Sequence, residues 1–160
     1  MKFVADRTLG KLAKELRMLG YDTLYYRGES GYPLIKLARE ENRVIVTRSP
    51  RLTPKRPEDR IVRIMENKPI LQLRELVQQK VISLLEEKLF SRCLLCNLTL
   101  HQISREEAES KVPDFIFYQE KEFLRCPQCS RIYWQGSHLR NMKRRIDELR
   151  RIQLQAINQT

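Results

Sequence analysis

The sequence of 160 residues contains only five glycines, and no apolar run in it approaches the length of a membrane-spanning helix. An acid already stands at Asp6, too early for the apolar stretch of a secretory signal peptide. These absences argue against a membrane protein or a secreted one and predict a soluble, cytoplasmic protein. Few glycines beside 32% charged residues are also a weak hint of a thermophilic protein.

Cysteine is equally scarce, and all four cysteines stand in two Cys-x-x-Cys pairs. Each pair lets two thiolates converge from one tight turn, and two pairs complete the closed four-sulfur shell that holds structural zinc. Two disulfides or two separate redox pairs are the alternatives, which an intracellular location and the lack of a spare thiol disfavour. The 29 residues between the pairs suit a zinc ribbon with a long β-excursion. The expected zinc ligands are Cys93, Cys96, Cys126 and Cys129.

Positive charge is in excess, with 31 Lys and Arg against 20 Asp and Glu and a formal net charge of +11. A four-thiolate zinc site would lower this charge by two, to about +9. Clustered basic residues neutralise phosphates and bind nucleic acid with little sequence preference. A solvated helix face and a contact for an acidic protein are the alternatives. The clusters comprise Arg48, Arg51, Lys55 and Arg56 in one stretch, and Arg140, Lys143, Arg144, Arg145, Arg150 and Arg151 near the C-terminus.

The spacing of apolar residues predicts alternating strands and helices in the first half of the chain. Such alternation indicates βαβ units that close on a parallel sheet, and hence an α/β fold. The strand at 44–47 is β-branched throughout, so it should be buried on both faces. We expect strands at 2–5, 22–26, 44–47 and 60–65, helices at 9–19 and 34–42, a loop at 49–57, and a helix over 70–85 that breaks near Lys80 or divides into two.

The pattern changes near residue 90, where short strands and cysteine turns replace the βαβ units. We therefore divide the chain into an α/β domain (1–89), a zinc ribbon (90–137) and a basic C-terminal helix (138–160). The last part is amphipathic and could pack back on the body or bind a partner protein. Its apolar positions recur at helical spacing: Met142, Ile146, Leu149, Ile152 and Ala156.

Several motifs are similar to those of one known family. They are Phe3-Val4-Ala5-Asp6, Leu9-Gly10-Lys11-Leu12-Ala13, Leu16-Arg17 and Leu19-Gly20-Tyr21-Asp22 at the start, Arg43-Val44-Ile45-Val46-Thr47-Arg48 in the third strand, and Arg92-Cys93, Cys96-Asn97, Tyr133-Trp134 and Gly136-Ser137-His138 in the ribbon. Together they resemble the Mut-seven C-terminal RNase domain family, a PIN-like nuclease fold joined to a zinc ribbon. The resemblance covers about residues 2–142 and implies a three-layer domain with a parallel sheet.

The resemblance also implies hydrolysis of RNA assisted by one or two Mg²⁺ or Mn²⁺ ions, which several carboxylates hold. Asp6, at the carboxyl end of the first strand, matches the first family acid, although alone it could be a helix N-cap. Ser49 stands where the third-strand motif usually continues to aspartate, and Gly31 stands where another acid is expected. Glu29 and Asp59 are the candidate replacements.

Three functions stay open. The incomplete acids favour an RNA-binding protein with weak or lost nuclease activity. An active Mg²⁺- or Mn²⁺-dependent ribonuclease that uses Asp6 with Glu29 or Asp59 is the alternative, and an adaptor for another protein is a minor one. Tyr133 and Trp134 could stack on bases or fill the small core of the ribbon. The candidate RNA contacts are Arg48, Arg51, Lys55, Arg56, Trp134, His138, Arg140, Lys143 and Arg144.

Overall fold

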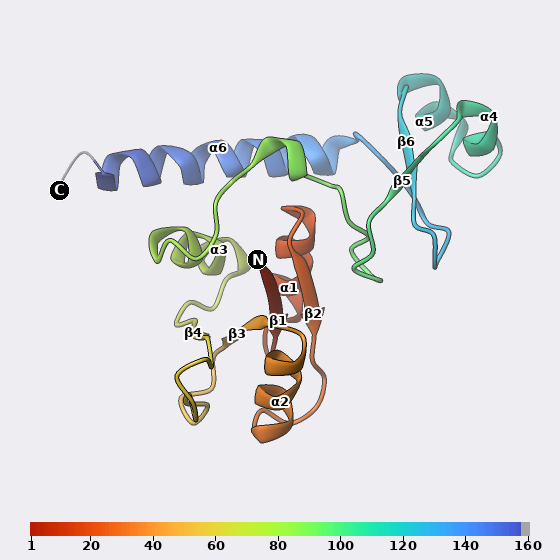
Figure 1. Cartoon of the computed structure of the whole chain (residues 1–160). Coiled ribbons are helices and arrows are strands. Elements are labelled where there is room, and N and C mark those ends of the chain that lie inside the picture. Colours follow the sequence, from red (N-terminus) through yellow and green to blue (C-terminus); the bar gives the residue numbers. More distant parts are fainter. Residues whose placement is uncertain (158–160) are drawn as a thin grey trace.

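A four-stranded parallel sheet forms the centre of the molecule (Figure 1). The computed structural model describes residues 1–157, apart from the side chains of residues 86, 138 and 152–157. The strand order is β2-β1-β3-β4, so the chain leaves β1 toward one edge and then crosses to its other side. This confirms the predicted parallel α/β fold. The strands are β1 (Lys2–Ala5), β2 (Asp22–Tyr25), β3 (Arg43–Thr47) and β4 (Ile61–Arg63).

Helices cover both faces of the sheet because alternate strand residues point to opposite sides. Phe3 packs in a core with α1 (Gly10–Met18) and α3 (Pro69–Gln78), whereas its neighbour Val4 packs with α2 (Tyr32–Glu40) on the opposite face. β3 is buried at all five positions, as its β-branched sequence predicts. The domain therefore has the three expected layers, with the sheet packed between helices on both faces.

The helix expected over 70–85 is shorter than predicted. α3 ends at Gln78, and Lys80 has a left-handed φ of 57°, which stops the helix. Ile82 and Leu84 are buried in the main core without helical structure, and a single 3₁₀ turn, η1 (Glu86–Lys88), follows. The prediction of a second helix here is wrong because apolar side chains of an irregular segment fill the same core positions.

The ribbon contains a small antiparallel sheet in the order β5-β6-β7. The expected long β-excursion between the cysteine pairs is confirmed only in part, since it contains the paired strands β5 and β6 and also two short helices. The first begins with a capping box in which Ser104 and Glu107 bond each other's backbone N–H groups. The elements are β5 (His101–Ile103), α4 (Arg105–Ala108), α5 (Asp114–Gln119), β6 (Phe123–Arg125) and β7 (Ile132–Trp134).

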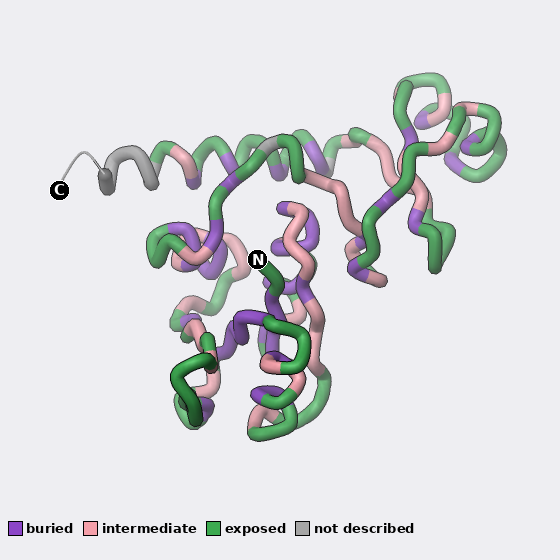
Figure 2. The backbone as a smooth tube through the Cα atoms, in the orientation of Figure 1, coloured by how far each residue is buried: buried purple, intermediate pink, exposed green. Residues whose placement is uncertain are grey.

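The C-terminal helix α6 (Ser137–Ile157) lies across the α/β domain, over α1 and α3 (Figure 1). Met142, Ile146 and Leu149 belong to the main core, and buried residues recur along the helix among exposed ones (Figure 2). This face of the helix thus packs back on the body, while basic side chains cover the outside. No helix in the described part of the chain is long and apolar enough to cross a membrane.

Replacing Ile146 with alanine should destabilise the whole protein, because this side chain is only 1% exposed and would leave a cavity between α6 and α3. We expect the free energy of unfolding to fall by about 2–5 kcal/mol in chemical denaturation with zinc present. Lys143→Ala, an exposed position on the same helix, is the matched control and should change stability little. Equal effects of the two substitutions would show that α6 is not part of the core.

Candidate functional site

Asp6 follows β1 at the carboxyl edge of the sheet, between the ends of β1 and β3 where the strand order reverses. This is the position at which open α/β sheets bind ligands. Its side chain is fully buried, and Oδ1 accepts hydrogen bonds from the Thr8 N–H (2.9 Å) and hydroxyl (2.6 Å). Oδ2 accepts a short bond from the Thr47 hydroxyl. Asp6 is not the N-cap of α1, which is Leu9, so the capping alternative is wrong.

A cleft of about 490 Å³ opens beside Asp6. Glu29 lines it from the loop after β2, so one of the two candidate replacement acids shares the cleft with Asp6. Ser49 also lines it, and its N–H donates to Thr47 Oγ1 at 3.0 Å. Three arginines face two carboxylates here, which gives the cleft an excess of positive charge. The complete lining is Asp6, Arg7, Thr8, Glu29, Ser30, Arg48, Ser49 and Arg51.

Asp59, the other candidate acid, lines a different pocket. Its carboxylate pairs with the Arg39 guanidinium through bonds of 2.6 and 2.9 Å. The N–H groups of Lys55 and Arg56 also donate to Oδ2, at 2.7 and 2.9 Å. Arg39 therefore holds the pKa of the Asp59 carboxyl well below its usual range, against the opposite effect of burial. The structure uses Asp59 to tie the basic loop to α2.

The four cysteine sulfurs converge to within 4.8 Å of one another. Zn–S bonds of about 2.3 Å in a tetrahedron would place sulfurs about 3.8 Å apart. Cys93 Sγ and Cys129 Sγ are 3.7 Å apart, too far for a disulfide, and all four cysteines are free. The spacing and the four sulfur donors therefore fit zinc and complete its shell without an open position.

Hydrogen bonds around Cys93 favour a thiolate. Burial opposes its ionisation, but bonds from the Tyr133 hydroxyl (3.2 Å) and the Cys96 N–H (3.3 Å) lower the pKa of Cys93 to about 6. The Tyr133 hydroxyl also accepts from the Leu94 N–H at 3.2 Å. Tyr133 packs against the cysteine core of the ribbon. Of the two roles considered for it, stacking on bases and filling the ribbon core, this contact is the second.

Two polar side chains fix the first cysteine pair to the edge strand β2. Arg17 donates to the carbonyls of Leu94 (2.7 Å) and Leu95 (3.0 Å) and to that of Thr23 (2.8 Å). Asn97, with a left-handed φ of 65°, accepts from the Thr23 N–H at 2.9 Å. Sequence reasoning did not assign a role to Arg17 or Asn97, although both lie in the motifs that carry the family resemblance.

A glycine allows the connection between domain and ribbon to pass close to α1. Gly20 has a φ of 86°, and a Cβ there would lie 2.3 Å from the Lys88 carbonyl oxygen. Gly20 directly follows Leu19, the C-cap of α1, which is the position where a left-handed glycine commonly ends a helix.

Two of the predicted RNA contacts, Arg48 and Arg51, line the cleft, and the other described ones are not among its lining residues. Arg48 lines the cleft and donates to Asn67 Oδ1 at 2.5 Å, whereas Trp134 is half-buried beside the second ribbon core. The side chain of His138 lies outside the described residues. Five further candidates are exposed. Lys55 and Arg56 lie on the loop after β3, and Arg140, Lys143 and Arg144 lie on α6.

The chain combines a parallel α/β domain that has an acid at its switch point with a four-cysteine ribbon. The model of the Mut7-C RNAse domain family matches residues 1–146, and the chain therefore belongs to this family. The family relates the protein to nucleases and to RNA. Neither a search of curated proteins nor a search of solved structures found a match.

Replacing one sulfur ligand should remove the metal. We expect elemental analysis of the purified protein to find one zinc ion per chain, and Cys126→Ser to lose most of it, because Cys126 is fully buried in the sulfur cluster. Leu95→Ala lies within the first cysteine pair without supplying a ligand, so it should retain zinc. Full zinc content in Cys126→Ser would contradict the four-sulfur site.

Proposed function

We propose that this protein binds RNA through the Asp6 cleft and its basic surroundings, and that its nuclease activity is weak or lost. The observation that carries the proposal is the composition of the cleft, in which Arg7, Arg48 and Arg51 outnumber Asp6 and Glu29. Arginine binds phosphate with two parallel hydrogen bonds, so such a cleft favours an anionic backbone.

The arrangement of oxygens supports weak catalysis. A Mg²⁺ or Mn²⁺ ion in a nuclease needs several hard oxygen ligands with negative charge. Both oxygens of Asp6 already accept hydrogen bonds from threonine groups, and Ser49 offers a neutral hydroxyl where the family motif has an acid. Glu29 is then the second carboxylate of the cleft, and it lies within the loop between β2 and α2.

The remaining basic surface adds affinity that does not depend on RNA sequence. The loop after β3 and the outer face of α6 present exposed Lys and Arg side chains, in a chain of net charge +11. Zinc, in this proposal, is structural: it fixes the ribbon and takes no part in chemistry, because four sulfurs leave no position for water.

An active Mg²⁺- or Mn²⁺-dependent ribonuclease is the second candidate. The observation in its favour is that Glu29 lines the same cleft as Asp6. A metal ion held between these carboxylates would lower the pKa of a bound water and stabilise negative charge on the phosphate.

Removing two cleft arginines tests the binding role. Arg48→Ala/Arg51→Ala should weaken binding of single-stranded RNA about tenfold at moderate salt, because both exposed side chains line the cleft. Fluorescence anisotropy at several salt concentrations measures the affinity. Lys36→Ala/Lys121→Ala removes the same charge from exposed positions elsewhere and is the control. The proposal fails if the unaltered protein does not bind RNA at low salt, or if the two double variants lose equal affinity.

Restoring the two acids tests the proposed loss of catalysis. Gly31 has an extended backbone, and a Cβ there would make only an ordinary contact of 3.9 Å with Pro33, so aspartate fits there, and Ser49 already lines the cleft. We expect Gly31→Asp/Ser49→Asp to cleave RNA faster with Mn²⁺ than the unaltered protein, in a gel assay of a labelled strand. Gly31→Asn/Ser49→Asn has nearly the same shape without the charge and should show no gain.

The same assay separates the two candidate functions. Mn²⁺-dependent cleavage by the unaltered protein that disappears in Asp6→Asn would establish the active ribonuclease and overturn weak or lost catalysis.

A further inference from the structure

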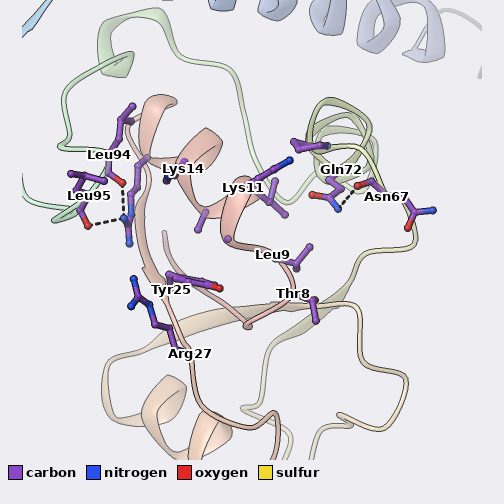
Figure 3. A pocket seen from close by; sticks show the side chains of 15 residues that line it. Thr8, Leu9, Lys11, Lys14, Tyr25, Arg27, Asn67, Gln72, Leu94 and Leu95 are labelled. Atoms are coloured by element: carbon purple, nitrogen blue, oxygen red, sulfur yellow. Dashed lines mark hydrogen bonds between the residues drawn. The ribbon is translucent and has the colours of Figure 1, made fainter.

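A second pocket, of about 610 Å³, lies beside the Asp6 cleft and is formed by both the domain and the ribbon. Figure 3 shows Lys11 and Lys14 of α1 between two walls, with Leu94 and Leu95 of the first cysteine pair on one side and Asn67 and Gln72 on the other. Tyr25 and Arg27 lie at its lower end in this view. None of these residues belongs to the basic clusters seen in the sequence.

The basic residues that line this pocket are not balanced by acidic ones. It contains Lys11, Lys14, Arg17 and Arg27 and no acidic residue. Lys11, Lys14 and Arg27 are exposed, so their charges are available to a ligand. Arg17 is buried and bonded to the carbonyls of Leu94 and Leu95 (dashed in Figure 3), so it fixes the wall of the pocket. An anion with several charges is the ligand that this lining favours.

Flat and apolar groups complete the lining. The Arg27 guanidinium lies 5.7 Å from the centre of the Tyr25 ring, and that ring packs against Gly10, where a Cβ would come within 3.1 Å of it. Leu95 is 48% exposed on the opposite wall. Guanidinium planes and apolar surfaces of this kind accept unstacked bases, while lysines hold the phosphates between them.

The pocket adjoins the Asp6 cleft. Thr8 lines both cavities. The Tyr25 hydroxyl, from the pocket, donates at 2.9 Å to the carbonyl of Arg7, which lines the cleft. A strand whose phosphate lies against Arg48 and Arg51 can therefore pass over Thr8 toward Lys11 and Lys14.

We propose that this pocket holds the backbone of single-stranded RNA on its way to or from the Asp6 cleft. The proposal rests on the proposed RNA-binding function and adds a second contact, made by α1 and the first cysteine pair. Single-stranded RNA fits because its bases are free to meet Arg27 and Leu95, whereas a duplex keeps its bases stacked inside.

Lys11→Ala/Lys14→Ala tests the pocket. Both side chains are exposed, so the variant should fold and keep its zinc, which circular dichroism and elemental analysis check. We expect affinity for a single-stranded oligonucleotide to fall about tenfold at moderate salt. If each lysine contacts one phosphate, the slope of log affinity against log salt should become shallower by about 1.4, since each contact with a single strand contributes about 0.7.

The control Lys36→Ala/Lys121→Ala removes equal charge outside the pocket and should leave the salt slope unchanged. If the unaltered protein binds no RNA, the proposed function fails. If it binds RNA and the pocket variant loses no more affinity than the control, the pocket proposal alone is overturned, and an acidic peptide becomes the anion to test there. A loss several times that of the control, with a shallower slope, supports the pocket.

Discussion

The molecule depends on one junction, where the first cysteine pair is bonded to the open edge of the parallel sheet. β2 is an edge strand, and Asn97 accepts a hydrogen bond from its Thr23 N–H. Asn97 also donates to Asp22 at 2.8 Å. Burial opposes ionisation of that carboxyl, but bonds from Arg43 and Asn97 outweigh it and lower its pKa. Buried polar groups destabilise a protein unless they form hydrogen bonds. The hydrogen bonds between Asn97 and β2 therefore fix the first cysteine pair of the ribbon to the domain.

This junction links the four-cysteine cluster to the basic pocket. Residues 93–97 supply two of the four clustered sulfurs, the carbonyls bonded by Arg17, and the wall formed by Leu94 and Leu95. A zinc ion that closes the sulfur shell would therefore also hold the pocket wall in place. A structural metal can in this way shape a binding surface without touching its ligand.

Charge decides what the switch point of the sheet can bind. The cleft lies at this switch point beside Asp6, and arginines exceed carboxylates among the residues that line it. Positive charge attracts a phosphate and repels a divalent cation, so one surface cannot serve both equally well unless further acids are close. The proposed function rests on the attraction of phosphate.

Much of the fold could be predicted from local patterns. The β-branched run at 44–47 and the apolar spacing of α1 and α2 depend on neighbours in the chain, and those elements lie where expected. The helices between the cysteine pairs were missed, although Ser104 and Glu107 carried a capping-box signal. The second helix after Lys80 was wrong because apolar spacing records burial and cannot separate a helix from an irregular segment packed in the same core.

The sequence by itself determined the chemistry that is available: four thiols in two close pairs, an acid at the end of a strand, serine and glycine where acids are expected, and an excess of arginine. The thiols, the acid and the arginines follow from residue type and short spacing, and the positions of the serine and the glycine follow from the family resemblance. Only the tertiary structure decided which groups meet. Glu29 shares a cleft with Asp6 while Asp59 pairs with Arg39, and Lys11 and Lys14 gain a wall from residues about eighty positions away. Contacts of that range depend on how sheet, helices and ribbon pack, which local sequence does not specify.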